Sequence, residues 1–226
     1  MTVRHTYSKM IVAGACLAGI MFFQGVASAQ INPASSSTLQ PLDAKGIETL
    51  NQPSPLGDIV YGNPDAKVTV VEFSSITCSH CAAFAVDIFP RIKKDYIDTG
   101  KIKFIFRDLA FDSYAVAGYA LARCQGNDKF PEVVDYFFKN LGRFSDNSKP
   151  AAEILRDMAF EAGIPKDKFT SCLGDLKIRE GLKAVRDQAG LLDVNGTPSF
   201  FINGKKHVGD YSYDTLKPIL DKELGE

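Results

Sequence analysis

The chain has 226 residues, of which 45% are hydrophobic and 23% are charged, with a formal net charge of −1. These values are typical of a soluble protein and exclude a disordered chain, a collagen-like chain and a multi-span membrane protein. The balance of charges gives no reason to expect nucleic acid or an anionic membrane as a partner. The length predicts one domain of ordinary size.

Residues 1–29 have the pattern of a secretory signal peptide. Arg4 and Lys9 precede an uncharged apolar run over residues 11–23, which is short for a transmembrane helix. Small residues at Ala27 and Ala29 then form a cleavage site. We therefore expect export of the chain. The alternative interpretation is an uncleaved membrane anchor.

Residues 30–57 are rich in Ser, Pro and Gln, which predicts a flexible leader with a turn or two of helix over residues 43–50. Folded structure is expected to begin near residue 58. The continuous β-branched run over residues 68–73 then predicts a central strand buried on both faces. Glu72 is the one charged residue in this run.

A second strand and a helix are predicted after the first. Apolar residues recur at helical spacing from residue 82 onward, with a kink expected at Pro90 and an end near Gly100. Residues 101–107 then alternate as a strand. The order strand, helix, strand predicts a parallel pair with a right-handed crossover.

The next part of the chain, about residues 112–190, has only helical patterns. The helices are predicted at residues 114–124, 132–141, 151–162, 166–173 and 176–189. A hairpin over 199–202 and 205–208, turned at Asn203-Gly204, and a helix over 213–224 complete the chain. This order predicts an α/β domain over residues 58–226, with a thioredoxin-type layout and an inserted helical subdomain.

The motif Cys78-Ser79-His80-Cys81 lies where the first strand leads into a helix. Unpaired N–H groups and the helix dipole favour a thiolate at Cys78, and Cys81 is close enough in sequence to close a small disulfide ring. His80 offers a charged or hydrogen-bonding partner that stabilises the reduced form. The motif therefore indicates redox chemistry. The alternatives are half of a zinc site and an inert structural bridge.

These motifs, together with Gly196-Thr197-Pro198-Ser199-Phe200-Phe201-Ile202-Asn203-Gly204 and the final Tyr-led helix, resemble the DsbA family of thiol:disulfide oxidoreductases. The resemblance covers residues 58–226. It implies that Pro198 is cis beside the active-site disulfide, although a trans proline opening a strand is the simpler interpretation. It also implies that Glu72 lies under the disulfide and moves protons, whereas the bland alternative is a surface acid. Ser79 departs from the Pro found in the best-known oxidases of the family, so the oxidising power is open.

Cys124 and Cys172 lie on predicted helices in the helical block, 48 positions apart. In an oxidising compartment a matched pair favours a disulfide, which we interpret as structural because neither residue has a second cysteine close in sequence. The alternative is two buried free cysteines.

The leading hypothesis is a monomeric, exported oxidase of the periplasm that donates the Cys78–Cys81 disulfide to reduced or unfolded exported proteins, with no cofactor and no metal. In it Cys78 is attacked, Cys81 resolves the mixed disulfide, and Gly196, Thr197 and Pro198 hold an extended substrate strand. The resemblance implies a DsbB-type membrane protein as reoxidising partner. The alternatives are an isomerase or reductase of the same fold, and a periplasmic metal-binding or chaperone protein.

Overall fold

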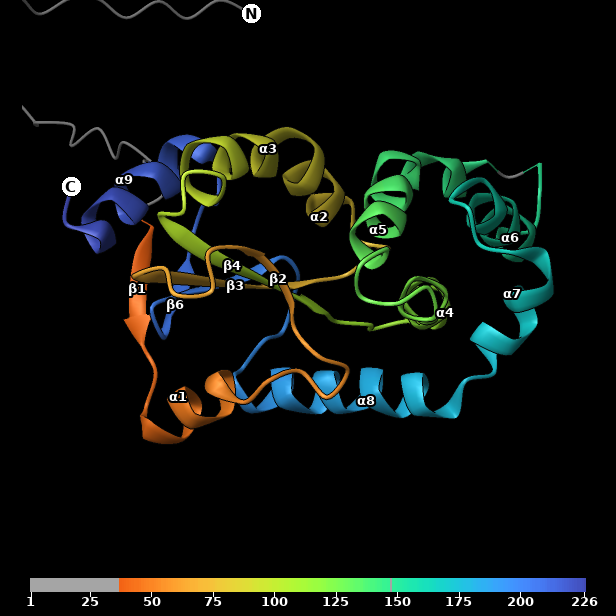
Figure 1. Cartoon of the computed structure of the whole chain (residues 1–226), viewed down its shortest axis with the longest axis horizontal. Helices are drawn as coiled ribbons and strands as arrows, with labels where there is room; N and C mark the ends of the chain where they lie inside the picture. Colours follow the sequence, from red (N-terminus) through yellow and green to blue (C-terminus); the bar gives the residue numbers. More distant parts are fainter. Residues whose placement is uncertain (1–36, 147) are drawn as a thin grey trace, which may run out of the picture. The chain divides into compact units, whose positions relative to one another are not determined.

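The computed structural model describes residues 37–146 and 148–226, and the expected signal peptide over residues 1–29 lies outside them. A mixed sheet forms the centre, with the strand order β1-β6-β5-β3-β4-β2 (Figure 1). The strands are β1 (Thr38–Pro41), β2 (Ile59–Gly62), β3 (Val68–Ser74), β4 (Ile102–Asp108), β5 (Ser199–Ile202) and β6 (Lys205–Val208). β3 runs parallel to β4 and antiparallel to β5, as a central strand of β-branched residues requires.

One face of the sheet is covered by a long broken helix and by the last helix. The broken helix consists of α2 (Ser79–Ala83), η1 (Phe84–Ile88), α3 (Phe89–Ile92) and η2 (Lys93–Ile97), and the last helix is α9 (Tyr213–Leu224). η1 is π-helical and ends two residues before Pro90, which has no N–H for a bond one turn back. The disturbance expected at Pro90 therefore takes the form of a wider turn. Val70, Phe84 and Leu216 belong to the apolar core of this face.

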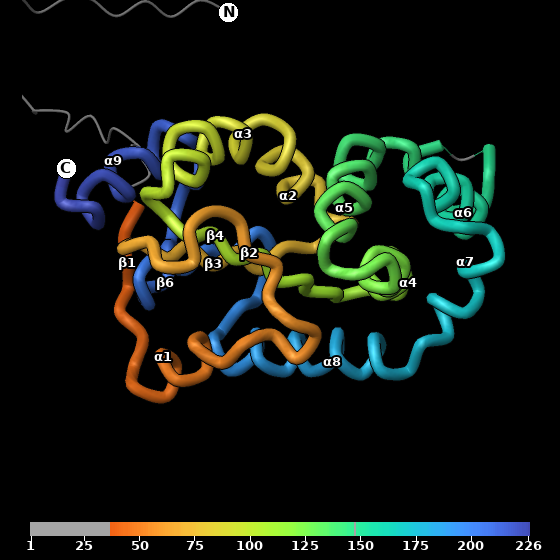
Figure 2. The backbone as a smooth tube through the Cα atoms, viewed as in Figure 1, coloured from red at the N-terminus to blue at the C-terminus, as the bar shows by residue number. Residues whose placement is uncertain are grey.

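The opposite face of the sheet is covered by α1 (Ala44–Asn51) and α8 (Leu176–Leu191), which run side by side in Figure 2. Val71 and Phe73 of β3 pack here against Val185 of α8 and Leu50 of α1. Because side chains alternate along a strand, Glu72 and Ser74 point to the other face, under α2.

The helical block lies beyond the carboxyl end of β3 and β4. It comprises α4 (Ser113–Arg123), α5 (Phe130–Lys139), η3 (Leu141–Ser145), α6 (Ala151–Glu161) and α7 (Lys166–Leu173), and it leads into α8. Tyr119, Phe130 and Phe137 are among the fully buried residues of its core. The predicted α/β fold with an inserted helical subdomain is confirmed. None of the helices in residues 37–226 has the length and apolarity to cross a membrane.

The flexible leader expected over residues 30–57 is wrong for its described part, although the turn or two of helix expected over residues 43–50 is present as α1. β1 pairs antiparallel with β6, and the Asp43 side chain caps α1 by accepting a hydrogen bond from the Gly46 amide at 2.7 Å. Arg107 of β4, only 1% exposed, donates to the carbonyls of Leu50 at 3.0 Å and Gln52 at 2.8 Å. The segment is ordered by partners far away in the sequence, which its own Ser, Pro and Gln content does not reveal.

Candidate functional site

Cys78 is the residue that caps the N-terminus of α2. Its extended backbone (φ −90°, ψ 121°) ends a turn in which the Cys78 amide donates to the Ser75 carbonyl at 3.0 Å. The side chain is half-buried, and its sulfur lies 3.2 Å from the carbonyl oxygen of Thr197. The sulfur is therefore held at the surface, where another thiol can reach it.

The surroundings of Cys78 favour its thiolate. A hydrogen bond from the Cys81 thiol contributes most to lowering its pKa to about 5, with further hydrogen bonds from the Thr197 side chain and from the amides of Cys81 and His80. Partial burial works in the opposite direction and is overcome. These donors are those that a helix N-terminus supplies. Cys78 is a thiolate at neutral pH.

Cys81 is the opposite of Cys78 in both exposure and acidity. Its side chain is 0% exposed, and its sulfur accepts a hydrogen bond from the Ser75 amide at 3.4 Å. Burial is the main reason that the pKa of Cys81 is raised far above its usual value, and the neighbouring Cys78 and Glu72 raise it further. Cys81 therefore holds its proton while Cys78 has lost its own.

Glu72 lies on β3 below α2 and is only 3% exposed, so the surface-acid interpretation is wrong. Burial raises the pKa of Glu72 to about 8, a contact with Ser74 lowers it, and the Cys78 thiolate raises it. The carboxyl group is therefore mostly protonated at neutral pH. A buried acid in this state can give or take a proton near the two cysteines.

His80 is exposed on the first turn of α2. Within the described part of the chain, its imidazole makes no hydrogen bond, whereas its backbone amide is one of the donors to the Cys78 sulfur. The structure thus brings the peptide group of His80 to the reactive sulfur and leaves the ring in solvent. The expected influence of the imidazole on Cys78 stays a prediction.

The segment Gly196-Thr197-Pro198 passes beside Cys78, and the Thr197–Pro198 peptide bond is cis. Gly196 is exposed, and its carbonyl accepts a hydrogen bond from the Ser199 hydroxyl at 2.7 Å. Thr197 and Pro198 are half-buried. Thr197, which is more than a hundred positions from the motif, therefore borders the reactive sulfur, and Gly196 and Pro198 flank Thr197 in the sequence.

The sequence analysis missed several residues around the site. Ser75 supplies the amide that bonds to Cys81, and Tyr119 of α4 donates its hydroxyl to the Ser74 carbonyl at 2.7 Å. Ser74 itself is fully buried beside Glu72 and Cys81. The sequence offers one signal for Ser74, because its spacing of two from Glu72 places both residues on one face of the strand.

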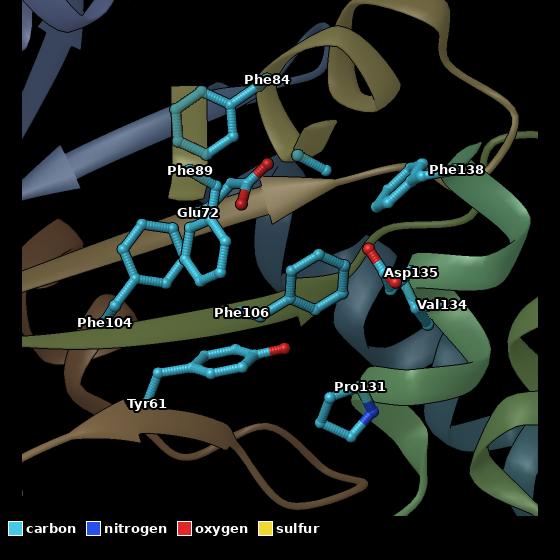
Figure 3. A pocket seen from close by; sticks show the side chains of 11 residues that line it. Tyr61, Glu72, Phe84, Phe89, Phe104, Phe106, Pro131, Val134, Asp135 and Phe138 are labelled. Carbon is cyan, nitrogen blue, oxygen red and sulfur yellow. The ribbon is translucent and has the colours of Figure 1, made fainter. Parts of the chain in front are cut away.

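A pocket of about 60 Å³ opens beside Glu72. In Figure 3 the Glu72 side chain points from β3 among the aromatic rings of Phe84, Phe89 and Phe104, while Tyr61 and Asp135 lie on the side toward α5. The volume is room for a few water molecules, since one water occupies about 30 Å³ in the liquid. Glu72 is therefore one of the few polar groups that line a small, largely apolar pocket.

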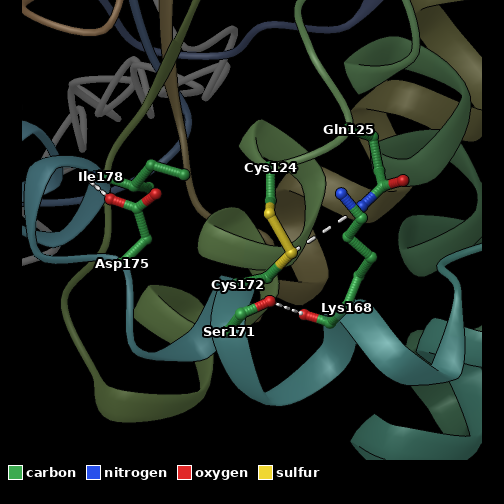
Figure 4. Close-up of a disulfide and its surroundings, with 7 residues drawn as sticks. All are labelled: Cys124, Gln125, Lys168, Ser171, Cys172, Asp175 and Ile178. Atoms are coloured by element: carbon green, nitrogen blue, oxygen red, sulfur yellow. Dashed lines mark hydrogen bonds between the residues drawn. A yellow bond between two sulfur atoms is a disulfide. The ribbon is translucent and has the colours of Figure 1, made fainter.

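Cys124 and Cys172 form a disulfide, with their Cα atoms 5.6 Å apart (Figure 4). Cys124 directly follows α4, and Cys172 lies in the last turn of α7. The bond ties together two helices of the helical block. No group of three or more His, Cys, Asp or Glu side chains suited to a metal ion occurs within residues 37–146 and 148–226.

The fold and the site together define a thioredoxin-fold protein with a Cys-x-x-Cys pair, and known proteins agree. The thioredoxin family model matches residues 54–222. A putative protein-disulfide oxidoreductase of Rickettsia felis is 36% identical over 171 residues, 75% of this chain and 61% of its own. A probable disulfide bond formation protein D of Bacillus cereus is 32% identical over 171 residues, 72% of this chain and 77% of its own.

The crystal structure of alpha-DsbA1 from Wolbachia pipientis superposes with a TM-score of 0.70 and 28% identity, over 80% of this chain and 96% of that one. This chain belongs to the thioredoxin family and, within it, to the DsbA-like proteins. The match spans about three fifths of the Rickettsia felis relative, at 61% of its length.

Proposed function

We propose that this protein is an exported thiol:disulfide oxidoreductase that introduces disulfide bonds into secreted or periplasmic proteins through the Cys78–Cys81 pair. The observation that carries the proposal is the contrast between the two sulfurs. Cys78 is reachable and has a pKa lowered to about 5, whereas Cys81 is buried and holds its proton. A pair whose reduced form is stabilised in this way gives up its disulfide readily and acts as an oxidant.

In this reaction Cys78 is the sulfur that a substrate thiolate attacks, and Cys81 is the sulfur that leaves. A second substrate thiolate then resolves the mixed disulfide, whereas attack by Cys81 would return the substrate in its reduced form. Glu72 supplies protons beneath the pair, and His80 tunes the reduced form. Gly196, Thr197 and Pro198 bind an extended segment of substrate beside the sulfur. The 3.2 Å contact between Thr197 and Cys78 supports that placement. The names of the relatives, a protein-disulfide oxidoreductase and a disulfide bond formation protein, support the activity.

The substrates we propose are reduced proteins that reach the periplasm, and the pattern of residues 1–29 supports export to that compartment. A DsbB-type membrane protein is the proposed reoxidant, and the protein is proposed to act as a monomer. The structural role proposed for the Cys124–Cys172 bond is supported by its position inside the helical block.

Equilibration of the purified protein with glutathione buffers tests the proposal against an isomerase or reductase of the same fold. We expect a midpoint potential above roughly −200 mV, at or beyond the poise of an oxidising secretory compartment. We also expect the oxidised protein to reactivate a reduced, unfolded test enzyme that requires disulfides. A potential near about −270 mV, the range of cytosolic reductants, would contradict the oxidase proposal.

A further inference from the structure

Ser74 is the last residue of β3 and is 0% exposed. Its carbonyl accepts hydrogen bonds from the Leu109 amide at 2.8 Å and from the Tyr119 hydroxyl at 2.7 Å. Its own hydroxyl oxygen, in contrast, is one of two buried side-chain atoms in the described residues that have no hydrogen-bond partner. A buried polar atom without a partner costs about 1–3 kcal/mol, so its presence at a reactive site needs an explanation.

The position of the Ser74 hydroxyl explains why it lacks a partner. Ser74 and Glu72 share the face of β3 that α2 covers, and Cys81 lies on α2. The Cys81 sulfur accepts a hydrogen bond at 3.4 Å from the amide of Ser75, the residue that follows Ser74, and Ser74 lowers the pKa of both Glu72 and Cys81. A serine hydroxyl can donate one hydrogen bond and accept others, and it rotates freely when no partner holds it. Ser74 is thus placed between an acid and a sulfur and can bond to either.

We propose that the Ser74 hydroxyl relays a proton between the Glu72 carboxyl group and the Cys81 sulfur during disulfide exchange. The inference rests on the proposed function, because only a pair that opens and closes makes a Cys81 thiolate. Ser74 lies on the path of the proton and makes no bond to substrate. The hydroxyl makes no hydrogen bond in this structure, so the relay requires the Ser74 side chain to turn toward Glu72 and Cys81.

A substrate thiolate attacks the Cys78 sulfur, a substrate–Cys78 bond forms, and the Cys78–Cys81 bond breaks with its electron pair on Cys81. The Ser74 proton passes to the Cys81 thiolate, and the Glu72 proton passes to the Ser74 oxygen. Glu72 regains a proton from water in the adjoining pocket. The second substrate thiolate then attacks the mixed disulfide and releases Cys78 as a thiolate, so that one proton is taken up for each disulfide made.

Other titratable groups face this cluster from the elements packed against it. They are Cys78 on α2, Tyr61 on β2, Asp108 on β4, Tyr119 on α4, Asp135 on α5 and Tyr211 before α9. Burial raises the pKa of Tyr61, Tyr119 and Tyr211, so these hydroxyls stay protonated. Asp108 pairs with Arg123 at 2.7 Å, and Asp135 is at the exposed end of the pocket. Glu72 is left as the acid that serves Cys81.

The relay is tested with three variants: Ser74→Ala, Ser74→Thr, which keeps the hydroxyl, and Ser75→Ala as the matched control. The Ser75 hydroxyl lies 3.3 Å from that of Thr77, and its amide, which bonds to Cys81, is unchanged by the substitution. The first measurement is the titration of the Glu72 carboxyl by carbon NMR. Ser74→Ala should raise this pKa, whereas Ser74→Thr and Ser75→Ala should leave it near wild type.

The second measurement is the rate at which a small thiol reduces the oxidised protein, followed across the neutral pH range. Ser74→Ala should slow it roughly tenfold, toward the low end of what a positioned proton donor contributes. Ser74→Ala should also remove the dependence of this rate on Glu72. The variant that combines Glu72→Gln with Ser74→Ala should therefore be no slower than Glu72→Gln alone. Ser74→Thr should recover the rate.

An unchanged titration and an unchanged rate in Ser74→Ala would overturn the relay. A further loss when Ser74→Ala is added to Glu72→Gln would also contradict it, because independent effects add whereas one shared path does not. If instead the wild-type protein fails to exchange thiols, the proposed function fails, and the NMR titration still decides whether Ser74 contacts Glu72.

Discussion

The two cysteine pairs of this molecule lie at opposite ends of helices. Cys78 caps the N-terminus of α2, whereas Cys124 follows the C-terminus of α4 and Cys172 is in the last turn of α7. The positive end of a helix dipole favours a thiolate, and the negative end disfavours one. The helix end therefore favours exchange at the Cys78–Cys81 pair and a lasting bond between Cys124 and Cys172, although the bond is chemically the same.

The loops that the two bonds close differ as well. Cys78 and Cys81 are joined by two residues within one helical turn, so their bond constrains little of the unfolded chain. Cys124 and Cys172 are 48 positions apart, and their bond links separate helices. Opening the Cys78–Cys81 bond therefore changes the charge at one sulfur, whereas opening the Cys124–Cys172 bond releases a large loop.

The largest difference between the two cysteine pairs is expected in thiol–disulfide exchange. Cys78→Ala should abolish exchange with a model thiol substrate. Cys81→Ala should still form mixed disulfides through Cys78, because the exposed, low-pKa sulfur remains. Mass spectrometry of the trapped adducts measures both. The Cys124→Ala/Cys172→Ala double variant is the control and should keep exchange. Adducts on Cys81 in the Cys78→Ala protein would reverse the assignment of the two sulfurs.

The same double variant should lower the free energy of unfolding by up to about 4 kcal/mol, the loop-entropy value for a loop of this length. Urea unfolding with the Cys78–Cys81 pair held reduced gives the difference. The glutathione equilibrium of that pair should not move. A stable double variant with an altered potential would mean that the second bond tunes the site and that the two pairs are not independent.

The free energy of unfolding should depend on pH through the buried carboxyl group of Glu72. The pKa of Glu72 is raised from 4.5 to about 8, so the folded protein binds more protons than the unfolded chain between these values. The contribution of Glu72 to stability is therefore fully present below pH 4.5 and is lost as the pH rises through 8, with a slope of up to about 1.4 kcal/mol per pH unit.

Glu72→Gln should remove this slope and become progressively more stable than wild type as the pH rises. The measurement is urea unfolding of the oxidised proteins, in which Cys78 does not titrate. In the reduced protein Cys78 acts in the opposite sense, because its pKa falls from 9.0 to about 5 and its stabilisation is lost as the pH drops through that range. Parallel pH profiles for wild type and Glu72→Gln would show that Glu72 is ionised in the folded state.

The smallest effect is expected from His80→Ala. Loss of the imidazole should weaken the oxidant by at least about 30 mV, which corresponds to 1.4 kcal/mol for a two-electron couple. Glutathione equilibration of the variant beside wild type measures the shift. An unchanged potential would assign the stabilisation of Cys78 to the backbone amides alone.

Elements with their own periodicity were predicted well from the sequence. The strands over residues 199–202 and 205–208 and the helices over 166–173 and 213–224 have the predicted bounds. The motif at Cys78 and Cys81 was recognisable because strand, motif and helix are contiguous. The disulfide joins Cys124 to Cys172, as the count of cysteines suggested.

Elements ordered by distant partners were missed. β1 and α1 have a polar composition and are fixed by β6, Arg107 and Gln188, whose side-chain amide donates to the Thr49 carbonyl at 2.9 Å. β2 is a four-residue edge strand beside β4, too short to show a period. The role proposed for Ser74 depends on packing between β3 and α2. The sequence of one strand does not show which helix packs on it.

The strand pairings also set the order in which this protein can mature. β1 pairs with β6 and β3 with β5, so both ends of the chain must meet before the sheet closes. Contacts of such long sequence separation slow folding, because chain entropy is lost before they form. During synthesis the thiols of Cys78, Cys81 and Cys124 all emerge before that of Cys172. The Cys124–Cys172 bond can therefore form only after Cys172 has been synthesised, either by oxidation at that stage or by reshuffling of an earlier bond. The folding chain must thus form this bond in the presence of two other thiols, those of Cys78 and Cys81.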